Sequence, residues 1–309
     1  EDKFEKLNLT KKDKRNSTAF LTIQEGCDKF CSFCVVPYTR GAERSRSPEV
    51  IIKEAKELVN SGVKEITLLG QNVNAYNGLN EKNKSIDFTS LIKILCKLDD
   101  LKRLRFVTSH PRDMTENLIN LFGQEEKLMP YLHLPIQSGS NQILKKMNRG
   151  HTVEYYLDII SKLKVIRPEI AISGDFIVGF PGETEEDFQK TLEICEIIKY
   201  SQAYSFKYSP RTGTPSFEMK DISEKVKSYR LSKLQETISI YQREFQKNLV
   251  GTVQDVLIEK LGKLSDQYIG RTPYMNPVVI KSKDNQIGKI LPVKICETNG
   301  LSLSGEHVI

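Results

Sequence analysis

The sequence predicts an α/β fold: a partial barrel of six βα units followed by a small all-β barrel. Between Ala19 and Tyr208, six short apolar runs alternate with longer helical patterns, which is typical of a parallel sheet with right-handed crossovers. A long charged helical pattern then covers residues 222–248. After Gly251 the chain changes to short β-like runs split by Gly, Asn and Pro, which favours a small antiparallel barrel.

The six apolar runs are the expected strands of the partial barrel. The helix expected after the fifth strand starts with Thr184 and Asp187, which resemble a capping box. Six units are too few for a closed eight-stranded barrel, so we expect an open one with its functional loops at the C-terminal ends of the strands. The expected strands are 19–23, 65–70, 103–108, 131–134, 172–179 and 203–208, and the expected helices are 48–61, 89–98, 115–122, 140–147, 153–165 and 184–199.

We expect three regions along the chain. Residues 1–16 are polar without apolar periodicity, so they are expected to be a linker. Residues 17–248 would form the partial barrel with a C-terminal helical extension. Residues 249–309 would form the small barrel, whose β-like runs are 252–261, 268–282, 286–298 and 301–309.

Composition favours a cytoplasmic protein that can meet nucleic acid. No run of about 18 apolar residues exists, which argues against a membrane span, and the chain is charged from Glu1 onward without the apolar core of a signal peptide. The net charge of +6 is mildly basic and is compatible with an RNA partner. In a reducing compartment, cysteines act as metal ligands or reactive groups more often than as disulfides.

Three of the six cysteines lie close together, at Cys27, Cys31 and Cys34. A structural zinc site needs four ligands, and no histidine lies nearby in the sequence. The other cysteines, Cys96, Cys195 and Cys296, are expected to be small buried hydrophobes. Three thiolates with an open fourth position fit a 4Fe-4S cluster in which one iron accepts a ligand from outside the protein.

The Cys-x3-Cys-x2-Cys spacing, with Phe33 before the last cysteine, resembles the signature of the radical S-adenosylmethionine (radical SAM) superfamily. The resemblance implies that the open iron binds the amino and carboxylate groups of SAM, and that one electron cleaves SAM to a 5′-deoxyadenosyl radical. The cofactor carries this chemistry, while the protein orients it and excludes water.

The same resemblance suggests SAM-binding residues in the loops after the other strands. Ser140 follows the fourth strand and is either a SAM ligand or a helix cap. His133 is expected to be a buried, hydrogen-bonded histidine. Arg149 either neutralises the SAM carboxylate or is a solvated charge at a helix end. The candidate SAM contacts are Gln71, Asn72, Gln137, Ser138, Arg149, Asp175 and Gly179.

Longer motifs resemble the methylthiotransferases of the MiaB family, which add a methylthio group to C2 of N(6)-dimethylallyladenosine at position 37 of tRNA. The resemblance implies a tRNA substrate, an electron donor such as flavodoxin or ferredoxin, and a monomeric protein. A related branch that acts on threonylcarbamoyladenosine is the alternative, as is a non-catalytic RNA-binding module that holds zinc. The motifs are EGCDKFCSFCVVPYTRG, LLGQNVNAY, HLPIQSGS, DFIVGFPGETEEDF and YSPRTGT.

The last 60 residues resemble the family's TRAM domain, a small RNA-binding β-barrel. Its charge is nearly balanced, with seven Lys/Arg and six Asp/Glu from Gly251 to Ile309, so RNA binding would depend on local placement. Tyr268 and Tyr274 either stack on bases or fill the barrel. The candidate RNA contacts are Arg40, Arg44, Arg46 and Arg211 near the motif loops, and Lys260, Lys263 and Arg271 in the small barrel.

The family carries a second 4Fe-4S cluster on three further cysteines in an N-terminal domain. This chain has no cysteine before Cys27. We therefore expect a fragment that holds only the SAM-binding cluster, with the second cluster in a domain outside it.

Overall fold

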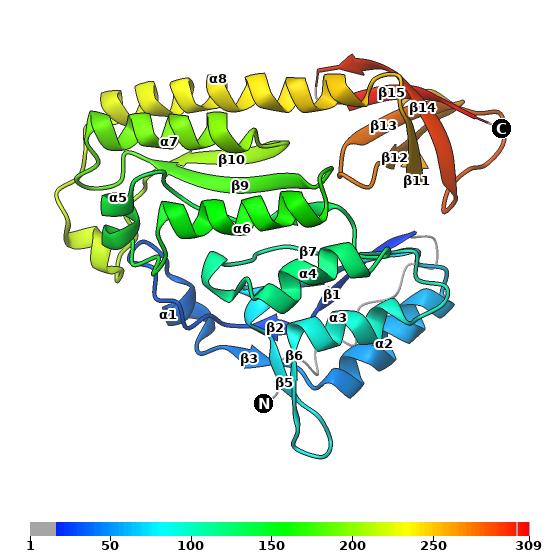
Figure 1. Ribbon diagram of the computed structural model, residues 1–309, viewed down its shortest axis with the longest axis horizontal. Coiled ribbons are helices and arrows are strands. Elements are labelled where there is room, and N and C mark those ends of the chain that lie inside the picture. Colours follow the sequence, from blue (N-terminus) through cyan, green and yellow to red (C-terminus); the bar gives the residue numbers. More distant parts are fainter. Residues whose placement is uncertain (1–16, 301, 309) are drawn as a thin grey trace.

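The structure is a computed structural model that describes residues 17–300 and 302–308, so the linker expected at 1–16 lies outside the described residues. Two units lie side by side (Figure 1): a large α/β unit and a small β-barrel. Helix α8 (Glu224–Leu249) runs along the top of the large unit and leads into the small barrel.

Six parallel strands form the partial barrel in two sheets. The first sheet has the order β1 (Thr18–Thr22), β4 (Glu65–Leu69), β7 (Arg103–Phe106). The second has the order β10 (Gln202–Lys207), β9 (Ala171–Val178), β8 (Tyr131–His133). A parallel bridge links Leu104 of β7 to Leu128, in the segment that leads into β8. All six predicted strands are confirmed, most within one residue of their predicted ends.

The expected helices are also confirmed, and each begins after a residue whose side chain accepts a backbone N–H of the first turn. Thr184 and Asp187 form the predicted capping box, which satisfies two N–H groups that the helix itself leaves unpaired. The helices are α2 (Pro48–Asn60), α3 (Phe88–Cys96), α4 (Glu116–Gln124), α5 (Asn141–Lys146), α6 (Val153–Ile166) and α7 (Glu185–Ile198).

Apolar and polar side chains alternate along the strands, so one face of each sheet packs in the apolar core and the other face lines the more polar barrel interior. On β9, Ile172, Phe176 and Val178 are buried in the core, while Ser173 and Asp175 face the other side. Burying each large apolar side chain contributes about 1.5–3 kcal/mol. The core therefore lies between the sheet and its helices, and it leaves the polar strand face free to line a site.

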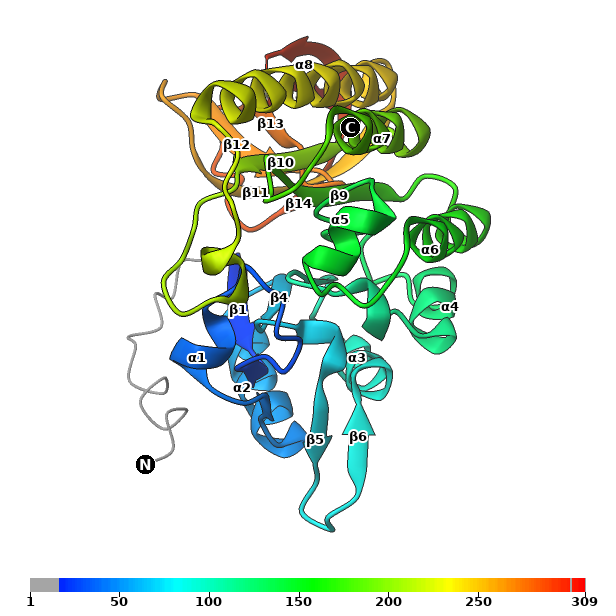
Figure 2. The same cartoon turned by 90° about the vertical axis from the view of Figure 1, so that its left-hand side faces the viewer.

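Five short strands and helices were not predicted. The strands β2 (Gln24–Glu25) and β3 (Arg44–Ser45) pair with each other, and helix α1 (Val36–Arg40) lies between them. A hairpin of β5 (Asn77–Leu79) and β6 (Ser85–Asp87) projects below the sheet in Figure 2. Segments of two to five residues are too short to show a hydrophobic period, so the sequence gives no signal for them.

The C-terminal unit is a closed five-stranded barrel, as predicted. Its pairing is antiparallel except between β13 and β15, which are parallel. The strands, in the order of the barrel, are β11 (Val253–Leu261), β12 (Gln267–Arg271), β13 (Pro277–Lys281), β15 (Ser302–His307) and β14 (Ile290–Asn299).

Two predictions for this barrel are settled. Cys296 is exposed, so its prediction as a buried residue is wrong. Its neighbour Ile295 takes the inward position, and side chains of adjacent strand residues point to opposite faces. Tyr268 is buried in the barrel core, and Tyr274 packs edge-on against Phe245 of α8. The tyrosine rings therefore fill and cover the barrel.

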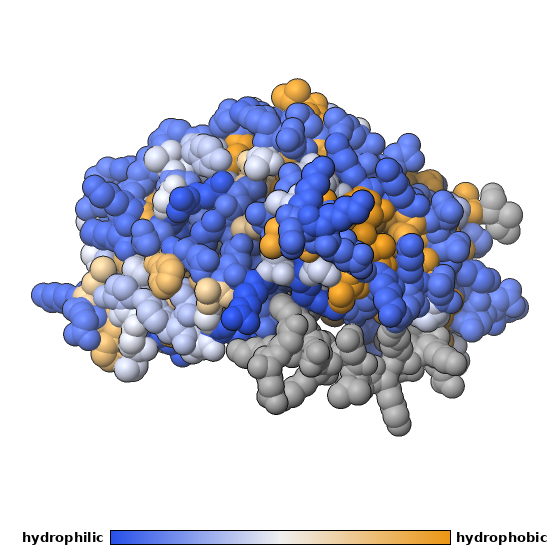
Figure 3. Space-filling view, turned by 90° about the horizontal axis from the view of Figure 1, so that it is seen from below, coloured by the Kyte–Doolittle hydropathy of each residue, from blue (hydrophilic) through white to orange (hydrophobic). Residues whose placement is uncertain are grey.

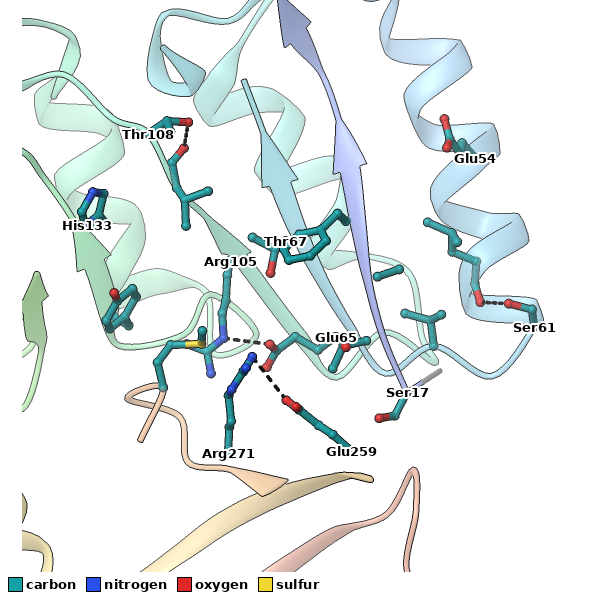
Figure 4. Close-up of a pocket in the computed structure, with 18 of the residues that line it drawn as sticks. Ser17, Glu54, Ser61, Glu65, Thr67, Arg105, Thr108, His133, Glu259 and Arg271 are labelled. Atoms are coloured by element: carbon teal, nitrogen blue, oxygen red, sulfur yellow. Dashed lines mark hydrogen bonds and ion pairs between the residues drawn. The ribbon is translucent and has the colours of Figure 1, made fainter. Parts of the chain in front are cut away.

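Buried arginines of the large unit fasten the small barrel to it. Arg103 donates to the backbone carbonyls of Asp255 and Arg271, and Arg105 to those of Thr272 and Pro273. Glu65 lies 3.0 Å from Nε of Arg105 and 3.7 Å from Nη1 of Arg103, as Figure 4 shows for the first pair. These charge-assisted hydrogen bonds fix the small barrel at the N-terminal ends of the sheet strands.

The lower face of the molecule is mostly hydrophilic, with a hydrophobic area right of its centre (Figure 3). No helix within the described part of the chain is both long and apolar enough to cross a membrane.

Candidate metal centre and active site

The three predicted cysteines lie in the loop between β2 and α1, at the C-terminal end of β1. Cys31 is buried, and Cys27 and Cys34 are half-buried. Burial raises the pKa of the Cys27 thiol, and the neighbouring Cys31 and Cys34 raise it further. Burial likewise raises the pKa of Cys34. A bound metal centre displaces the thiol protons, and its positive charge stabilises thiolates that would otherwise repel one another.

In the part of the chain that the structure describes, no group of three or more His, Cys, Asp or Glu is arranged to hold one metal ion. Cysteine thiolates are the usual protein ligands of a 4Fe-4S cluster, so three cysteines in one loop supply the type of donor that a cluster takes.

Neighbouring elements hold the cysteine loop at several points. Gln71 Oε1, at the end of β4, accepts from the N–H of Gly26 at 2.7 Å. Lys29 is 2.8 Å from Asp113, beyond β7. Ser32 donates its N–H to Met147 and its hydroxyl to Lys146, at the end of α5. The loop is thus positioned by the protein alone, which is what a preorganised metal site requires.

Arg149 is buried beside the cysteines. Its Nη1 is 3.4 Å from Sγ of Cys31, and its Nη2 donates to the carbonyl of Pro135 at 2.7 Å. Arg149 is therefore not a solvated charge at a helix end, which was one of its two predicted roles. Its contact with the SAM carboxylate stays a prediction. A positive charge beside Cys31 favours the thiolate and the negative charge of a bound cluster.

A polar group that the sequence only partly predicted lies next to Cys27. Asn72, which was predicted, is buried and donates to Asp113 at 2.7 Å, while its Oδ1 is buried without a partner. The pKa of the nearby Glu43 is raised to about 7, mainly by burial, with Asp113 and Asp28 adding to the rise and Lys29 opposing it. Glu43 and Asp113 were missed, because only the fold brings their loops to Asn72.

Three predicted SAM contacts also have structural roles, and their contact with SAM stays a prediction. Gln71 uses its side-chain oxygen on the cysteine loop. Ser138 is fully buried, and its Oγ accepts from the N–H of Ser140. Gly179 has a φ of +69°, and an added Cβ there would lie 2.4 Å from Cγ of Lys227. The space beside this glycine is therefore filled by a lysine stem.

Ser140 is a helix cap, the second of its two predicted roles. Its Oγ accepts from the N–H of Ile143 at the start of α5 and also donates to Asp187.

Gln137, Asp175 and His133 remain on the inner side of the second sheet. Gln137 has a φ of +79° and bridges to β9 through its backbone. His133 Nδ1 is 2.9 Å from Oγ of Ser173, and Nε2 is 3.4 Å from Oδ2 of Asp175. His133 is hydrogen-bonded as predicted, but it faces the barrel interior and not the apolar core.

Two further histidines, unassigned by the sequence, pack against each other near Arg149. The rings of His110 and His151 are 5.7 Å apart in an edge-to-face arrangement. Burial lowers the pKa of His151 to about 4 and that of His110 further, with Arg149 adding to both shifts. Both rings are therefore neutral at pH 7.

The predicted RNA contacts fall into two groups at opposite ends of the partial barrel. Arg40 and Arg44 flank the exposed side of the cysteine loop, and Arg211 is exposed on the loop after β10. Arg46 is buried and paired with Glu54 at 2.8 Å, so it does not join them. The remaining contacts, on the small barrel, are Lys260, Lys263 and Arg271.

Comparisons with known proteins agree with this arrangement. The model of the radical SAM superfamily matches residues 21–195, and that of the TRAM domain matches residues 247–308. A tRNA-2-methylthio-N(6)-dimethylallyladenosine synthase of Ruegeria sp. (strain TM1040) is 53% identical over 308 residues, which are 100% of this chain and 70% of that protein. The synthase of Rickettsia felis is 53% identical over 95% of this chain and 66% of its own length. This chain therefore spans about two thirds of these relatives.

Solved structures share the fold at low identity. The radical S-adenosylmethionine methyltransferase TsrM from Kitasatospora setae, with cobalamin and a [4Fe-4S] cluster bound, has a TM-score of 0.54 and 17% identity, covering 66% of this chain and 39% of its own. Streptococcus suis SuiB bound to S-adenosylmethionine has a TM-score of 0.51 and 15% identity, covering 74% of this chain and 48% of its own.

Proposed function

This chain belongs to the radical SAM superfamily and, within it, to the family of tRNA-2-methylthio-N(6)-dimethylallyladenosine synthases; from this premise we propose that the whole protein adds a methylthio group to C2 of N(6)-dimethylallyladenosine in tRNA. The chain described here would supply the SAM-binding cluster. We also propose that it works as a monomer in the cytoplasm and receives electrons from a flavodoxin- or ferredoxin-like protein.

The observation that carries this proposal is the anchored cysteine loop. Among the described residues, Cys27, Cys31 and Cys34 are the cysteines that lie at the C-terminal ends of the partial-barrel strands. The loop that carries them is held by contacts from the segments after β4 and β7 and from α5. When bound, a 4Fe-4S cluster and SAM supply one-electron cleavage chemistry. A four-iron cluster with three protein ligands leaves one iron free to bind SAM, so three cysteines are the number that this cofactor requires.

The chain's own residues would then bind and orient. Arg149 would stabilise negative charge on the cluster side. The unpaired Oδ1 of Asn72, with the carboxylates of Glu43 and Asp113, offers acceptors of the kind that an ammonium group requires. Asp175 and Gln137, on the inner strand face, remain proposed contacts for the rest of the cofactor.

For RNA, we propose that Arg40, Arg44 and Arg211 contact phosphates near the reaction centre, and that Lys260 and Arg271 contact RNA from the small barrel. Arginine and lysine side chains neutralise phosphates at the cost of strong salt dependence. The exposed arginines lie on separate loops, and each removed phosphate contact should lower the salt slope by about one.

Anaerobic reconstitution with iron and sulfide tests the cofactor part. About four irons per chain, with cleavage of SAM after reduction, supports the proposal. Stoichiometric zinc without cleavage contradicts it, and eight irons per chain would refute a single cluster. A variant with alanine at Cys34 is the matched control and should lose both properties.

The substrate is tested in the source organism by mass spectrometry of tRNA nucleosides from a deletion strain. Loss of the methylthio group from dimethylallyladenosine supports the proposal. Loss from threonylcarbamoyladenosine instead would assign the protein to the related branch.

A further inference from the structure

A cavity of about 1380 Å³ lies inside the partial barrel and extends toward the small barrel. Figure 4 shows that side chains of several strands line it: Thr67 from β4, Arg105 from β7 and His133 from β8. The floor is formed by Glu259 and Arg271 of the small barrel. The volume exceeds that of most small-ligand sites, about 300–1,000 Å³, so it can enclose a nucleoside with a substituent.

Two aromatic side chains face this cavity from the free edges of the sheet. Phe20 on β1 is 72% exposed and Tyr204 on β10 is 47% exposed, and both line the cavity. Their neighbours Ala19 and Ala203 pack against the core, so the strand period of two turns the aromatic rings inward. Large apolar surfaces left open in a concave site mark a place for an apolar ligand.

The polar side of the cavity is provided by His133. Its ring is held by Ser173 at 2.9 Å and by Asp175 at 3.4 Å. It also meets the Tyr204 ring edge-on, with 6.1 Å between centroids. A fixed imidazole beside an aromatic ring offers a hydrogen bond and a stacking surface together, which is the combination that recognises a nucleobase.

Both arginines that line the cavity are already paired with carboxylates. Arg105 is paired with Glu65 at 3.0 Å, and Arg271 lies 3.6 Å from Glu259. A carboxylate placed near His133 would also meet the carboxylate of Asp175. Specificity often arises from such unfavourable contacts as much as from favourable ones.

We propose that this cavity binds the N(6)-substituted adenine of the substrate, with Phe20 and Tyr204 enclosing the dimethylallyl group and His133 contacting the base. The inference rests on the proposed function and adds the residues that select the substituent. The apolar walls accept a neutral dimethylallyl group, whereas the threonylcarbamoyl group carries a carboxylate that Asp175 repels. Phe20 and Tyr204 therefore determine specificity.

The test measures binding of the iron–sulfur-loaded chain to three labelled anticodon stem-loops by fluorescence anisotropy. The RNAs are identical except for one adenosine, which is unmodified or carries the dimethylallyl or the threonylcarbamoyl group. We expect the dimethylallyl RNA to bind about 10-fold or more tightly than the other two, because a few buried methylene groups give discrimination of that order. The double variant F20S/Y204S should bind all three within about 2-fold, since its cavity edges are no longer apolar.

Two further variants keep the test decisive. The double variant F20L/Y204L keeps apolar walls and should retain most of the preference. Tyr229→Ser removes an aromatic side chain that is 56% exposed on α8, outside the cavity, and should leave the preference unchanged. Iron content, measured for each variant, reports whether it folds and loads.

Equal binding of the three RNAs by the wild-type chain, or an undiminished preference in F20S/Y204S, would overturn the inference. Failure of the proposed function looks different: the wild-type chain would hold no four-iron cluster or would not cleave SAM, whatever its RNA preference.

Discussion

Acidification should destabilise this fold through the histidine pair His110 and His151. Both rings are buried close to the guanidinium of Arg149, so the pKa of His151 falls to about 4 and that of His110 falls further. In the unfolded chain both would titrate near pH 6.5. The unfolded state therefore binds more protons below pH 6.5, and the stability present above that pH is lost as the pH falls toward the folded pKa.

The magnitude follows from these pKa values. Between pH 7 and pH 5 an unfolded histidine becomes almost fully protonated, while His151 in the fold stays mostly neutral. Linkage then gives a loss of about 2 kcal/mol for His151 and about the same for His110. These are upper values, because part of the His151 ring reaches solvent.

Guanidinium chloride unfolding of the cluster-free chain at pH 7 and pH 5 measures this loss. We compare the wild type with the double variant H110Q/H151Q, because glutamine keeps polar groups at both positions but takes up no proton. The fall in unfolding free energy between the two pH values should be smaller in the double variant by about 4 kcal/mol at most. His307→Gln, at an exposed position on β15, is the control and should behave as the wild type. If H110Q/H151Q lost as much stability as the wild type, the pKa argument would be wrong.

Three other changes test the site and the domain contact. Arg149→Gln should make the reduction potential of the cluster more negative by on the order of 60 mV, measured by a redox titration followed by electron paramagnetic resonance, because a cation beside Cys31 favours the reduced form. Arg105→Met should destabilise the chain by about 3–5 kcal/mol in thermal unfolding, since it leaves the buried carboxylate of Glu65 with only the more distant Arg103. Gly26→Ala should abolish iron loading, because its φ is +74° and an added Cβ would lie 2.1 Å from the carbonyl oxygen of Ala42.

Each of these changes has a matched control. Lys145→Gln removes an exposed charge from the same helix region as Arg149 and should leave the potential unchanged. Arg271→Gln breaks a half-exposed ion pair and should cost about 1 kcal/mol or less. Gly41→Ala also has a positive φ, but nothing lies within 4 Å of its added Cβ, so it should load iron. A normal cluster in Gly26→Ala would show that the loop can adapt to the added methyl group. Equal thermal stability of Arg105→Met and Arg271→Gln would show that the buried pair of Arg105 and Glu65 contributes little to stability.

Sequence patterns predicted the strands and helices well, because nearly every element of the large unit buries one face in the same hydrophobic core. The apolar residues of β4 or β9 therefore stand out over five to eight residues. The β2–β3 pair spans only two residues on each side, so no local pattern announces it. Cys296 shows a related limit. The alternation of apolar and polar residues indicates that its strand has an inner and an outer face, but which residues point inward depends on how the barrel closes.

The site was predictable where the chemistry is local and not where it depends on distant contacts. Three cysteines within eight residues are enough to predict a metal centre from the sequence. Gln71 was expected to contact SAM, yet its oxygen binds Gly26, which is 45 positions away. The sequence cannot distinguish a glutamine that contacts SAM from one that holds the cysteine loop, because both roles need a hydrogen-bond acceptor at a strand end. Glu43 lacks a signal for the same reason, since its importance comes from lying beside Asn72.

The anchoring of the cysteine loop also bears on how the protein withstands oxygen. Exposed iron–sulfur clusters are destroyed by oxidation, and in many small metal proteins loss of the metal means loss of the fold. Here protein groups outside the loop hold it as well: the Gln71 side chain accepts from Gly26, and Ser32 donates to the Lys146 carbonyl. Damage to the cluster should therefore remove only part of what positions the loop, and a cell can repair such a protein by delivering new iron and sulfide without making the chain again.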